Sequence, residues 1–309
     1  MEESNQTSSG RFILLGLSNV LHLQIIYFMV FLVMYLITLS GNFLVIIVVR
    51  INPKLHTPMY FFLSNLSVLD ICFSSTIVPR LLFNTLSRDR SISLLGCALQ
   101  MYFHLSSGAT ECVILAVMAY DRYVAICFPL RYMTIMSRRV CAYIAIGSWG
   151  SCLINAAVHV VLTFRLPFCR THHVNHFFCE LPLFFRMSCK DPWLNELINL
   201  FSALILAVGA FFLILISYIQ IISTILKISS SQGRQKTFST HSSCLTFNGE
   251  LDLSLYLRPH SASSPEVDKA VSLIYTAVTP MLNPIIYSMR NKDVINTIRM
   301  KLIRQTLNH

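Results

Sequence analysis

The amino-acid sequence predicts an all-α membrane protein, a seven-transmembrane helix bundle. The chain has 309 residues, of which 54% are hydrophobic and only 12% are charged. Soluble domains carry about a quarter charged residues, so a water-soluble globule of this composition would lack the polar surface to cover itself. Long segments without any charge recur along the chain, and their lengths suit a lipid bilayer.

Four of these segments contain no Asp, Glu, Lys or Arg. They span residues 12–49, 140–164, 197–226 and 270–289. Each holds at least the roughly 20 residues that a helix needs to cross the hydrocarbon core. Backbone groups in lipid must bond internally, and long runs of Leu, Ile and Val indicate helices rather than the alternating strands of a barrel.

Three further apolar segments carry acidic residues and bring the predicted number of membrane helices to seven. They lie near 58–79 with Asp70, near 91–120 with Glu111, and near 237–257 with Glu250 and Asp252. Because seven is odd, the two termini are expected on opposite faces of the membrane.

The basic residues decide which face is cytoplasmic. With the N-terminus extracellular, fourteen of the 24 Lys and Arg residues fall in cytoplasmic segments, alongside only Asp121 and Asp293 as acids. The cytoplasmic bias of Lys and Arg therefore predicts this orientation, in a multi-pass protein of the cell membrane surrounded by lipid. The formal net charge of +10 is then a topology signal. No nucleic-acid partner is expected, because no soluble stretch interleaves basic and aromatic residues.

The chain divides into an extracellular N-terminal tail at 1–22, a membrane domain at 23–289 and a cytoplasmic tail at 290–309. Its first residues are acidic, unlike the start of a cleaved signal peptide, so we expect the first membrane helix to act as the insertion signal. Asn5 begins an acceptor tripeptide for N-glycosylation. Apolar residues of the cytoplasmic tail share one helical face, which predicts a short cytoplasmic amphipathic helix after helix seven; a frayed basic tail is the alternative.

Four of the ten cysteines fall on the extracellular side, where disulfides persist. They are Cys97, Cys169, Cys179 and Cys189. Four cysteines allow three pairings, and counting does not choose among them. The other six lie in the predicted helices or at their cytoplasmic ends, where thiols stay reduced.

Asp70 and Glu111 lie at comparable depths in the second and third predicted helices. Ionisable residues inside a membrane are costly and are functional candidates by default. Two carboxylates in a dry bundle repel each other unless a proton or a cation relieves the repulsion. We predict a small-cation site for sodium with Asn42 as a further neighbour; the alternative is a protonated, hydrogen-bonded core cluster. No other cofactor is expected.

The run Met118–Cys127 ends the third predicted helix at the cytoplasmic face and contains Asp121, Arg122 and Tyr123. An Asp–Arg pair there can hold a helix end closed, and releasing Arg122 would expose a cationic fork for a partner. Pro284 in the seventh predicted helix removes a backbone donor and loosens the helix. Such a bend is what a two-state switch requires.

Together, these motifs match the sequence pattern of one protein family. The matching stretches cover nearly the whole chain: Gly41-Asn42, Leu55–Leu63, Met118–Cys127, Ser217-Tyr218, Lys236–Thr240 and Pro280–Tyr287. The second and third are highly specific. On these residues the chain resembles a rhodopsin-like G-protein-coupled receptor, and specifically an olfactory (odorant) receptor.

This resemblance implies a partner and several residue roles. It pairs Cys97 with Cys179 and Cys169 with Cys189. It implies a small volatile odorant as ligand and the stimulatory olfactory heterotrimeric G protein as partner, leading to adenylyl cyclase and cyclic AMP. The residues that it assigns to coupling and switching are Asp121 and Arg122 as an ionic lock, Tyr123, Tyr218 as a partner of Arg122 in the active state, and Asn283, Pro284 and Tyr287 in helix seven.

The resemblance also places an odorant pocket in the outer half of the bundle, between helices three, five, six and seven. The residues expected there are His104, Leu105, Gly108, Ala109 and Cys112, with His159, Ser202, Leu206 and Tyr275 nearby. Small and apolar groups with few polar anchors suit a volatile ligand. The alternative for each of these residues is plain helix packing.

The segment His176–Glu180 offers a His, a thiol and a carboxylate, a combination that ligates copper or zinc. A disulfide at Cys179 would remove the thiolate, so we predict no metal site.

One stretch departs from the family pattern. His241 and Cys244 stand where such receptors usually have Cys and His, and Thr246–Leu255 is about three residues short and carries Glu250 and Asp252. A change of that length turns the outer end of a helix by roughly 60°. Both acids are costly if they face lipid, and we expect them to face the bundle or the outer vestibule.

Two other classes of protein compete with a receptor. A transporter or channel would need internal repeats or a polar path, and neither is evident in the sequence. An intramembrane enzyme would need a nucleophile beside Asp70 and Glu111, and none accompanies them. The sequence therefore predicts a receptor and not an enzyme.

Overall fold

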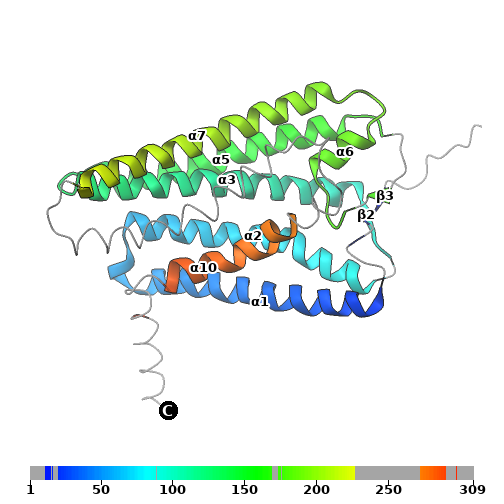
Figure 1. Cartoon of the computed structure of the whole chain (residues 1–309), viewed down its shortest axis with the longest axis horizontal. Helices are drawn as coiled ribbons and strands as arrows, with labels where there is room; N and C mark the ends of the chain where they lie inside the picture. Colours follow the sequence, from blue (N-terminus) through cyan, green and yellow to red (C-terminus); the bar gives the residue numbers. More distant parts are fainter. Residues whose placement is uncertain are drawn as a thin grey trace, which may run out of the picture.

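The computed structural model describes residues 11–14, 16, 20–87, 89–168, 173–174, 176–226, 272–289 and 297. Long helices dominate this part of the chain (Figure 1). They are α1 (Leu21–Ile51), α2 (Pro58–Leu86), α3 (Leu94–Cys127), α5 (Arg138–Phe164), α7 (Trp193–Leu226) and α10 (Thr279–Met289). Short helices connect them: η1 (Pro53–Leu55), α4 (Tyr132–Ile135), α6 (Leu181–Met187) and the π-helical η2 (Ile274–Val278), which continues into α10.

Four helices of the described residues, α1, α2, α5 and α7, are long and apolar enough to cross a membrane. They coincide with predicted spans of the sequence. The fifth long helix, α3, has 34 residues, a length of about 50 Å at the usual rise per residue. The predicted sixth helix at 237–257 and the predicted helix of the cytoplasmic tail lie outside the described residues.

The long helices form two layers (Figure 1). In one layer α3 packs against α5 and α7; in the other α1 packs against α2 and α10; α2 and α3 join the layers. At the seam a hydrophobic cluster includes Val45 of α1, Leu66 and Leu69 of α2, and Ile114 and Met118 of α3. The central position of α3 explains why polar residues along it reach the interior.

Side-chain caps and proline set where several helices begin. Ser93 accepts the N–H of Gly96 at the start of α3, and Ser137 accepts that of Val140 at the start of α5. Pro58 stands in the first turn of α2, where its missing N–H costs no intrahelical bond. A serine before a helix satisfies an N–H that otherwise has no partner.

One end of the bundle carries a small sheet, and we call it the sheet end; the other, which bears α4, is the α4 end (Figure 1). Strand β1 (Arg11–Leu14) lies between β2 (Ser91–Ser93), to which it is antiparallel, and β3 (His173–Val174), to which it is parallel. Phe12 and Leu14 are buried, as alternate residues of a strand share a face. Strand β1 thus lies within the predicted N-terminal tail at 1–22, where no strand was predicted.

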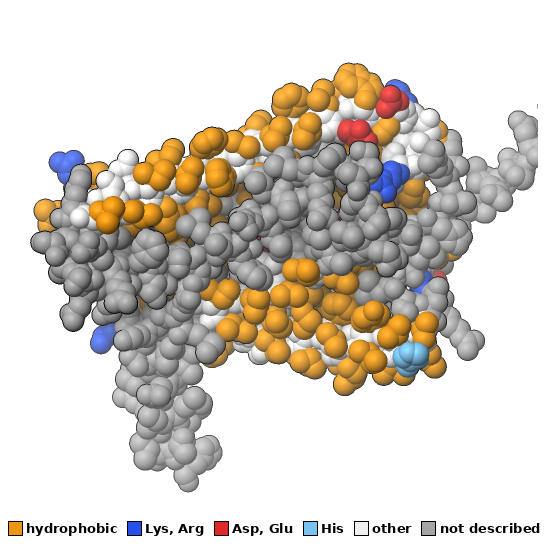
Figure 2. All heavy atoms as spheres, viewed as in Figure 1, with side chains coloured by type: hydrophobic (Ala, Val, Ile, Leu, Met, Phe, Trp, Pro, Cys, Tyr) orange, Lys and Arg blue, Asp and Glu red, His pale blue; other side chains and the backbone are white. Residues whose placement is uncertain are grey.

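Large apolar side chains cover the outside of the bundle. Figure 2 shows hydrophobic side chains along the visible helices, with the coloured charged groups gathered toward the ends. On α1, Ile26 and Val33 are exposed, and on α7 so are Ile205 and Phe212. A continuous exposed apolar surface of this size marks contact with a non-aqueous environment.

Candidate functional site

A polar cluster joins three helices in the bundle interior. The side-chain amide of Asn283 in α10 donates to Asp70 Oδ1 in α2 at 2.9 Å and to Glu111 Oε1 in α3 at 3.2 Å. All three residues are buried. One amide thus binds both carboxylates that the sequence analysis paired, and Asn283, expected in the switch, belongs to the same cluster.

Asn42 lies in the interior as expected, but it bonds to backbone. Its amide donates to the Thr38 carbonyl at 3.0 Å and to the Pro280 carbonyl of α10 at 3.3 Å. Next to it, a Cβ atom on Gly41 would lie 3.0 Å from Pro284 Cγ. The Gly41-Asn42 pair therefore brings α1 close to α10 beside the proline of the predicted switch.

At the α4 end, Asp121 of the Asp-Arg-Tyr motif is buried and accepts a hydrogen bond from the Tyr132 hydroxyl of α4 at 2.9 Å. Burial, reinforced by the Asp121 carboxylate, raises the pKa of Tyr132, so this hydroxyl stays a donor. Arg122 and Tyr123 are half-buried. The aspartate is thus tied to the loop that follows α3, and the Asp121–Arg122 lock stays a prediction.

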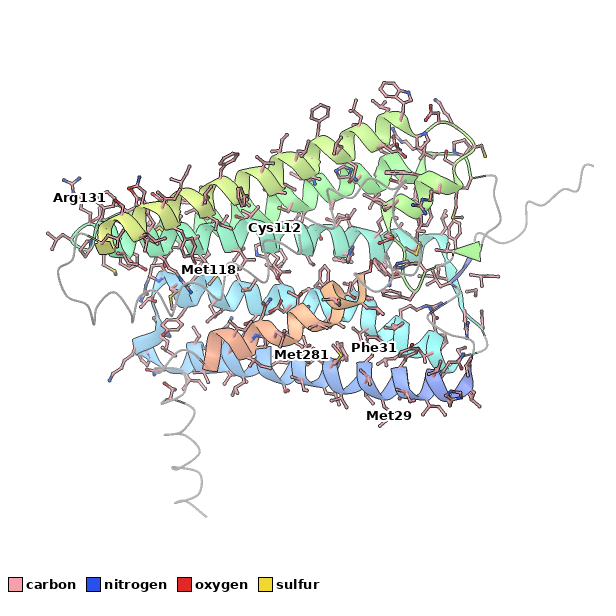
Figure 3. All side chains as sticks on the ribbon, viewed as in Figure 1. Met29, Phe31, Cys112, Met118, Arg131 and Met281 are labelled. Atoms are coloured by element: carbon pink, nitrogen blue, oxygen red, sulfur yellow. A yellow bond between two sulfur atoms is a disulfide. The ribbon has the colours of Figure 1, made fainter. Side chains whose placement is uncertain are left out.

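A second contact at this end links α3 to α7. Cys127 Sγ lies 3.2 Å from Thr224 Oγ1. Tyr218, the predicted active-state partner of Arg122, lies six residues before Thr224 in α7 and is half-buried. Figure 3 labels Arg131 at the α4 end, beyond the end of α3.

At the sheet end, a disulfide joins Cys97 of α3 to Cys179 of the long loop. This confirms the pairing implied by the family resemblance. Cys189 is also disulfide-bonded, and Cys169, its predicted partner, lies outside the described residues, as does Asn5.

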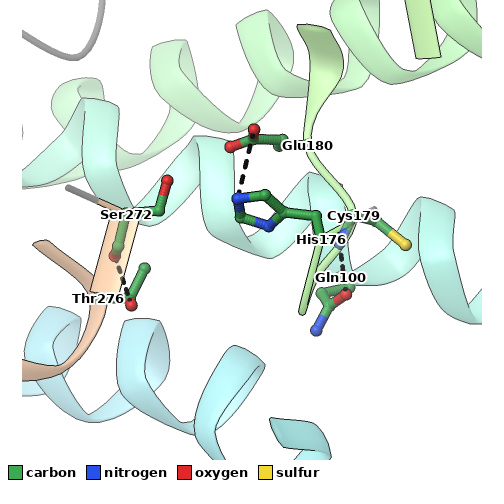
Figure 4. A network of polar contacts seen from close by, with 6 residues as sticks. All are labelled: Gln100, His176, Cys179, Glu180, Ser272 and Thr276. Carbon is green, nitrogen blue, oxygen red and sulfur yellow. Dashed lines mark hydrogen bonds and ion pairs between the residues drawn. The ribbon is translucent and has the colours of Figure 1, made fainter. Parts of the chain in front are cut away.

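Gln100, one turn after Cys97, holds the same loop (Figure 4). Its amide donates to the Thr76 carbonyl of α2 at 3.1 Å, and its Oε1 accepts the N–H of Cys179 at 3.1 Å. A buried amide with both ends bonded fixes the separation of the groups that it joins. Gln100 therefore ties α2, α3 and the loop together.

His176 and Glu180, part of the alternative metal site, face each other in this loop (Figure 4). His176 Nε2 lies 3.8 Å from Glu180 Oε1, and the imidazole stacks on Phe177 with ring centroids 4.5 Å apart. Because Cys179 is in a disulfide, the thiolate that a metal site here would require is missing.

The residues of the predicted pocket lie in the sheet-end half of α3 and on the helices beside it. His104, Gly108 and Ala109 are buried, and Leu105 and Cys112 are half-buried; Figure 3 labels Cys112 near the middle of α3. The His104 ring lies against Phe73 and Phe178, with centroids 4.8 and 5.0 Å away.

The pocket residues on the other helices have varied surroundings. His159 of α5 is buried, and Ser202 of α7 donates to Asn155 Oδ1 of α5 at 2.9 Å. Leu206 is half-buried, and Tyr275 belongs to η2, where its side chain is not described. Helix α3 packs against both α5 and α7, so the helices that carry these residues are neighbours in the bundle, and the pocket itself stays a prediction.

Comparison with known proteins decides the family. A family model described as olfactory receptor matches residues 31–305. The chain belongs to the olfactory receptor family. It is similar to human olfactory receptor 5G3, with 46% identity over 309 residues, 99% of this chain and 98% of the relative.

Other relatives agree. Human olfactory receptor 2F1 is 46% identical and the dog olfactory receptor-like protein OLF3 is 45% identical, each over 297 residues that cover 95% of this chain and 94% of the relative. Membership makes the chain a multi-pass membrane receptor rather than an enzyme, and it accounts for the apolar helices.

Several contacts that shape this olfactory receptor were not predicted from the sequence. Gln100 is a polar residue within a predicted membrane helix, and that was a usable signal. Tyr132 and Asn155 gave none, because their partners are set by the tertiary packing of separate helices. Phe177 and Phe178 were considered only as neighbours of a metal site, and the structure places both rings in the core.

Proposed function

We propose that this olfactory receptor binds small volatile odorants in a pocket at the sheet end and activates the stimulatory olfactory heterotrimeric G protein from the α4 end. The observation that carries this proposal is the family match across residues 31–305, with relatives 46% identical over nearly the full chain. Activation of this G protein would raise cyclic AMP through adenylyl cyclase.

The proposed topology has seven membrane helices, an extracellular N-terminus and a cytoplasmic amphipathic helix. It keeps an extracellular tail at 1–22, a receptor domain at 23–289 and a cytoplasmic tail at 290–309. The disulfide of Cys97 lies at the sheet end, which suits the oxidising exterior. Arg131, Arg138 and Arg139 follow α3 at the α4 end, which suits the cytoplasm.

The pocket that we propose is apolar with few polar anchors. Gly108 and Ala109 on α3 are buried and small, which would leave room for a ligand, while His104 and the Ser202–Asn155 pair would supply polar groups. A small apolar site with one or two polar groups suits a volatile ligand, whose affinity comes mostly from burial of apolar surface. Helix α3 contains no acid between Leu94 and Thr110, and this disfavours cationic ligands.

For the switch we propose that Asn283 reports the state of Asp70 and Glu111. A sodium ion or a proton at these carboxylates, with Asn42 close by, would neutralise their repulsion. Because Asn283 adjoins Pro284, a change in the cluster would bend the end of α10 that carries Tyr287. At the α4 end, Asp121 and Arg122 would separate, and Arg122 would meet Tyr218 and the G protein.

A cyclic-AMP reporter in cells that display the receptor tests this function. We expect a dose-dependent rise with at least one member of a chemically mixed odorant panel. The Arg122→Ala variant, at matched surface expression, should lose the response, whereas Arg186→Ala, in the loop helix α6, should keep it. An equal response of the Arg122→Ala variant would contradict the proposed coupling.

Epitope tags test the topology independently of any odorant. An antibody applied to intact cells should reach a tag before Met1 and should reach a tag after His309 only when the membrane is permeabilised. Access to both tags from the same side would exclude an odd number of spans.

A further inference from the structure

Two phenylalanines of the long loop, Phe177 and Phe178, lie deep inside the bundle. Each side chain is only 1% exposed. Both belong to a hydrophobic cluster with Phe31 of α1, Ile77 of α2 and Ala277 of η2. The loop therefore fills the space between α1, α2 and η2 at the sheet end with its own side chains. We call the side chains of Phe177 and Phe178 the aromatic plug.

The two rings of the plug differ in what they touch. Phe178 lies against His104 of α3, with ring centroids 5.0 Å apart. The ring contacts of Phe177 within the described residues are with His176 at 4.5 Å and with Phe178 at 5.0 Å. His176 also contacts the Phe178 ring, with centroids 4.8 Å apart. Phe178 is thus the ring of the plug that meets His104, while Phe177 makes no ring contact with His104 among the described residues.

Phe178 is held in place from both directions along the chain. The next residue, Cys179, is bonded to Cys97 and donates its N–H to Gln100. Two residues earlier, the His176 carbonyl accepts the N–H of Gly16 at 3.4 Å. Figure 4 shows how close His176, Cys179 and Gln100 lie. A ring fixed in this way keeps its position without a ligand to order it.

We propose that Phe178 determines odorant size by closing the pocket toward Phe31 of α1, Ile77 of α2 and Ala277 of η2. This inference rests on the proposed function, because it assumes that odorants bind beside His104. The ligand is then confined to the His104 side of the Phe178 ring. An apolar cavity of about 150 Å³ can hold a benzene molecule, so truncating this ring would free space for up to about six carbon atoms, part of which the neighbouring side chains would refill.

The test uses two chemical series on cells that display the full receptor: straight-chain alcohols from hexanol to dodecanol, and the matching aldehydes. For Phe178→Ala we expect the preferred chain to lengthen by about two to four carbons, since each fitting methylene changes discrimination by roughly tenfold or more. Phe178→Leu should lengthen it by about one carbon. Surface expression is measured for every variant by flow cytometry.

Phe177→Ala is the matched control. It removes the same side chain, at the same burial, from the neighbouring position of the same loop. Because Phe178 still closes the pocket, the preferred chain length should equal that of the unmodified receptor. An unchanged preference in Phe178→Ala and Phe178→Leu, or the same lengthening in Phe177→Ala, would overturn the proposal.

A second measurement needs no agonist. The Ala277→Cys variant places a thiol on η2 beside the aromatic plug. Its reaction with methyl methanethiosulfonate is followed by peptide mass spectrometry. Adding Phe178→Ala should speed labelling at position 277 at least tenfold, and adding Phe177→Ala should change it less than twofold. Equal labelling rates in the Phe178→Ala and Phe177→Ala variants would show that Phe178 does not close the pocket. If the unmodified receptor responds to no odorant while labelling follows the expected pattern, the proposed function is wrong and the closing role of Phe178 is retained.

Discussion

The two ends of this receptor are held together by different kinds of contact. At the sheet end, a disulfide, a three-stranded sheet, the Gln100 amide and the aromatic plug all fasten the long loop to α2 and α3. At the α4 end, the described links between elements include single side-chain contacts such as Tyr132 with Asp121 and Cys127 with Thr224. Apolar packing also holds the α4 end, where Leu55, Val124 and Met136 belong to one buried cluster. An end closed by a disulfide suits a preformed binding site, and an end whose described contacts are non-covalent suits rearrangement.

The largest effect is expected from breaking the disulfide of the sheet end. Cys97→Ser should destabilise the receptor by about 2–5 kcal/mol, because the bond closes a long loop, and should remove most of it from the cell surface. Cys72→Ser, at an exposed thiol of α2, is the control and should leave flow-cytometry signals unchanged. Normal surface levels of Cys97→Ser would mean that the sheet end does not depend on this bond.

The second-largest effect is expected at the close contact between α1 and α10, which lies between the two ends of the bundle. Gly41→Val places a branched side chain 3.0 Å from Pro284 and should cost about 1–3 kcal/mol. Gly147→Ala in α5 is the contrast, since a Cβ atom there meets nothing within 4 Å. That change should stabilise the helix by up to about 1 kcal/mol. Melting temperatures of the purified receptor should therefore move in opposite directions, and a shared direction would contradict the close approach.

Gln100 allows the sheet end to be weakened in steps. Gln100→Ala leaves the Thr76 carbonyl and the Cys179 N–H without this partner and should cost about 1–3 kcal/mol. Gln100→Glu keeps an acceptor for the Cys179 N–H, so its melting temperature should lie between those of the unmodified receptor and Gln100→Ala. Gln220→Ala, at an exposed position of α7, should melt like the unmodified receptor. If Gln100→Ala also melted like the unmodified receptor, the Gln100 amide would not be needed to hold the long loop.

The smallest effect is expected at the α4 end. Tyr132→Phe removes the hydroxyl that donates to Asp121, a hydrogen bond worth about 0.5–1.5 kcal/mol. The basal cyclic-AMP signal should rise by roughly twofold to tenfold, while melting changes little. Tyr143→Phe, at a tyrosine of α5 that is 74% exposed, should leave the basal signal unchanged. An unaltered signal in Tyr132→Phe would show that this contact does not restrain the inactive state.

How much of the structure the sequence predicts follows from the range of the interactions involved. Charge-free length alone predicts α1, α5 and α7, because spanning a bilayer is a local property of a segment. The cost of burying charge likewise singles out Asp70 and Glu111, and the structure brings both to Asn283. The disulfide between Cys97 and Cys179 needed the family resemblance, since their spacing alone left three pairings open.

Contacts between distant segments were beyond the sequence. Phe12 and Leu14 look like part of a polar tail until β2 and β3 supply the ladder on either side. Phe177 and Phe178 read as loop residues, because the space that they fill is formed by α1, α2 and η2 together. Tyr132 reaches Asp121 only because α4 folds back against α3. Such partners depend on tertiary packing rather than on local pattern.

The position of β1 between two later strands has a consequence for how the receptor is made. Ile13 pairs with Ser91 on one side and with His173 on the other. The ribosome therefore synthesises β1 first, yet this strand cannot complete its ladder until the chain through Val174 has been synthesised. Until then the apolar side chains of β1 lack their final neighbours. Folding of the sheet end therefore depends on synthesis of the long loop.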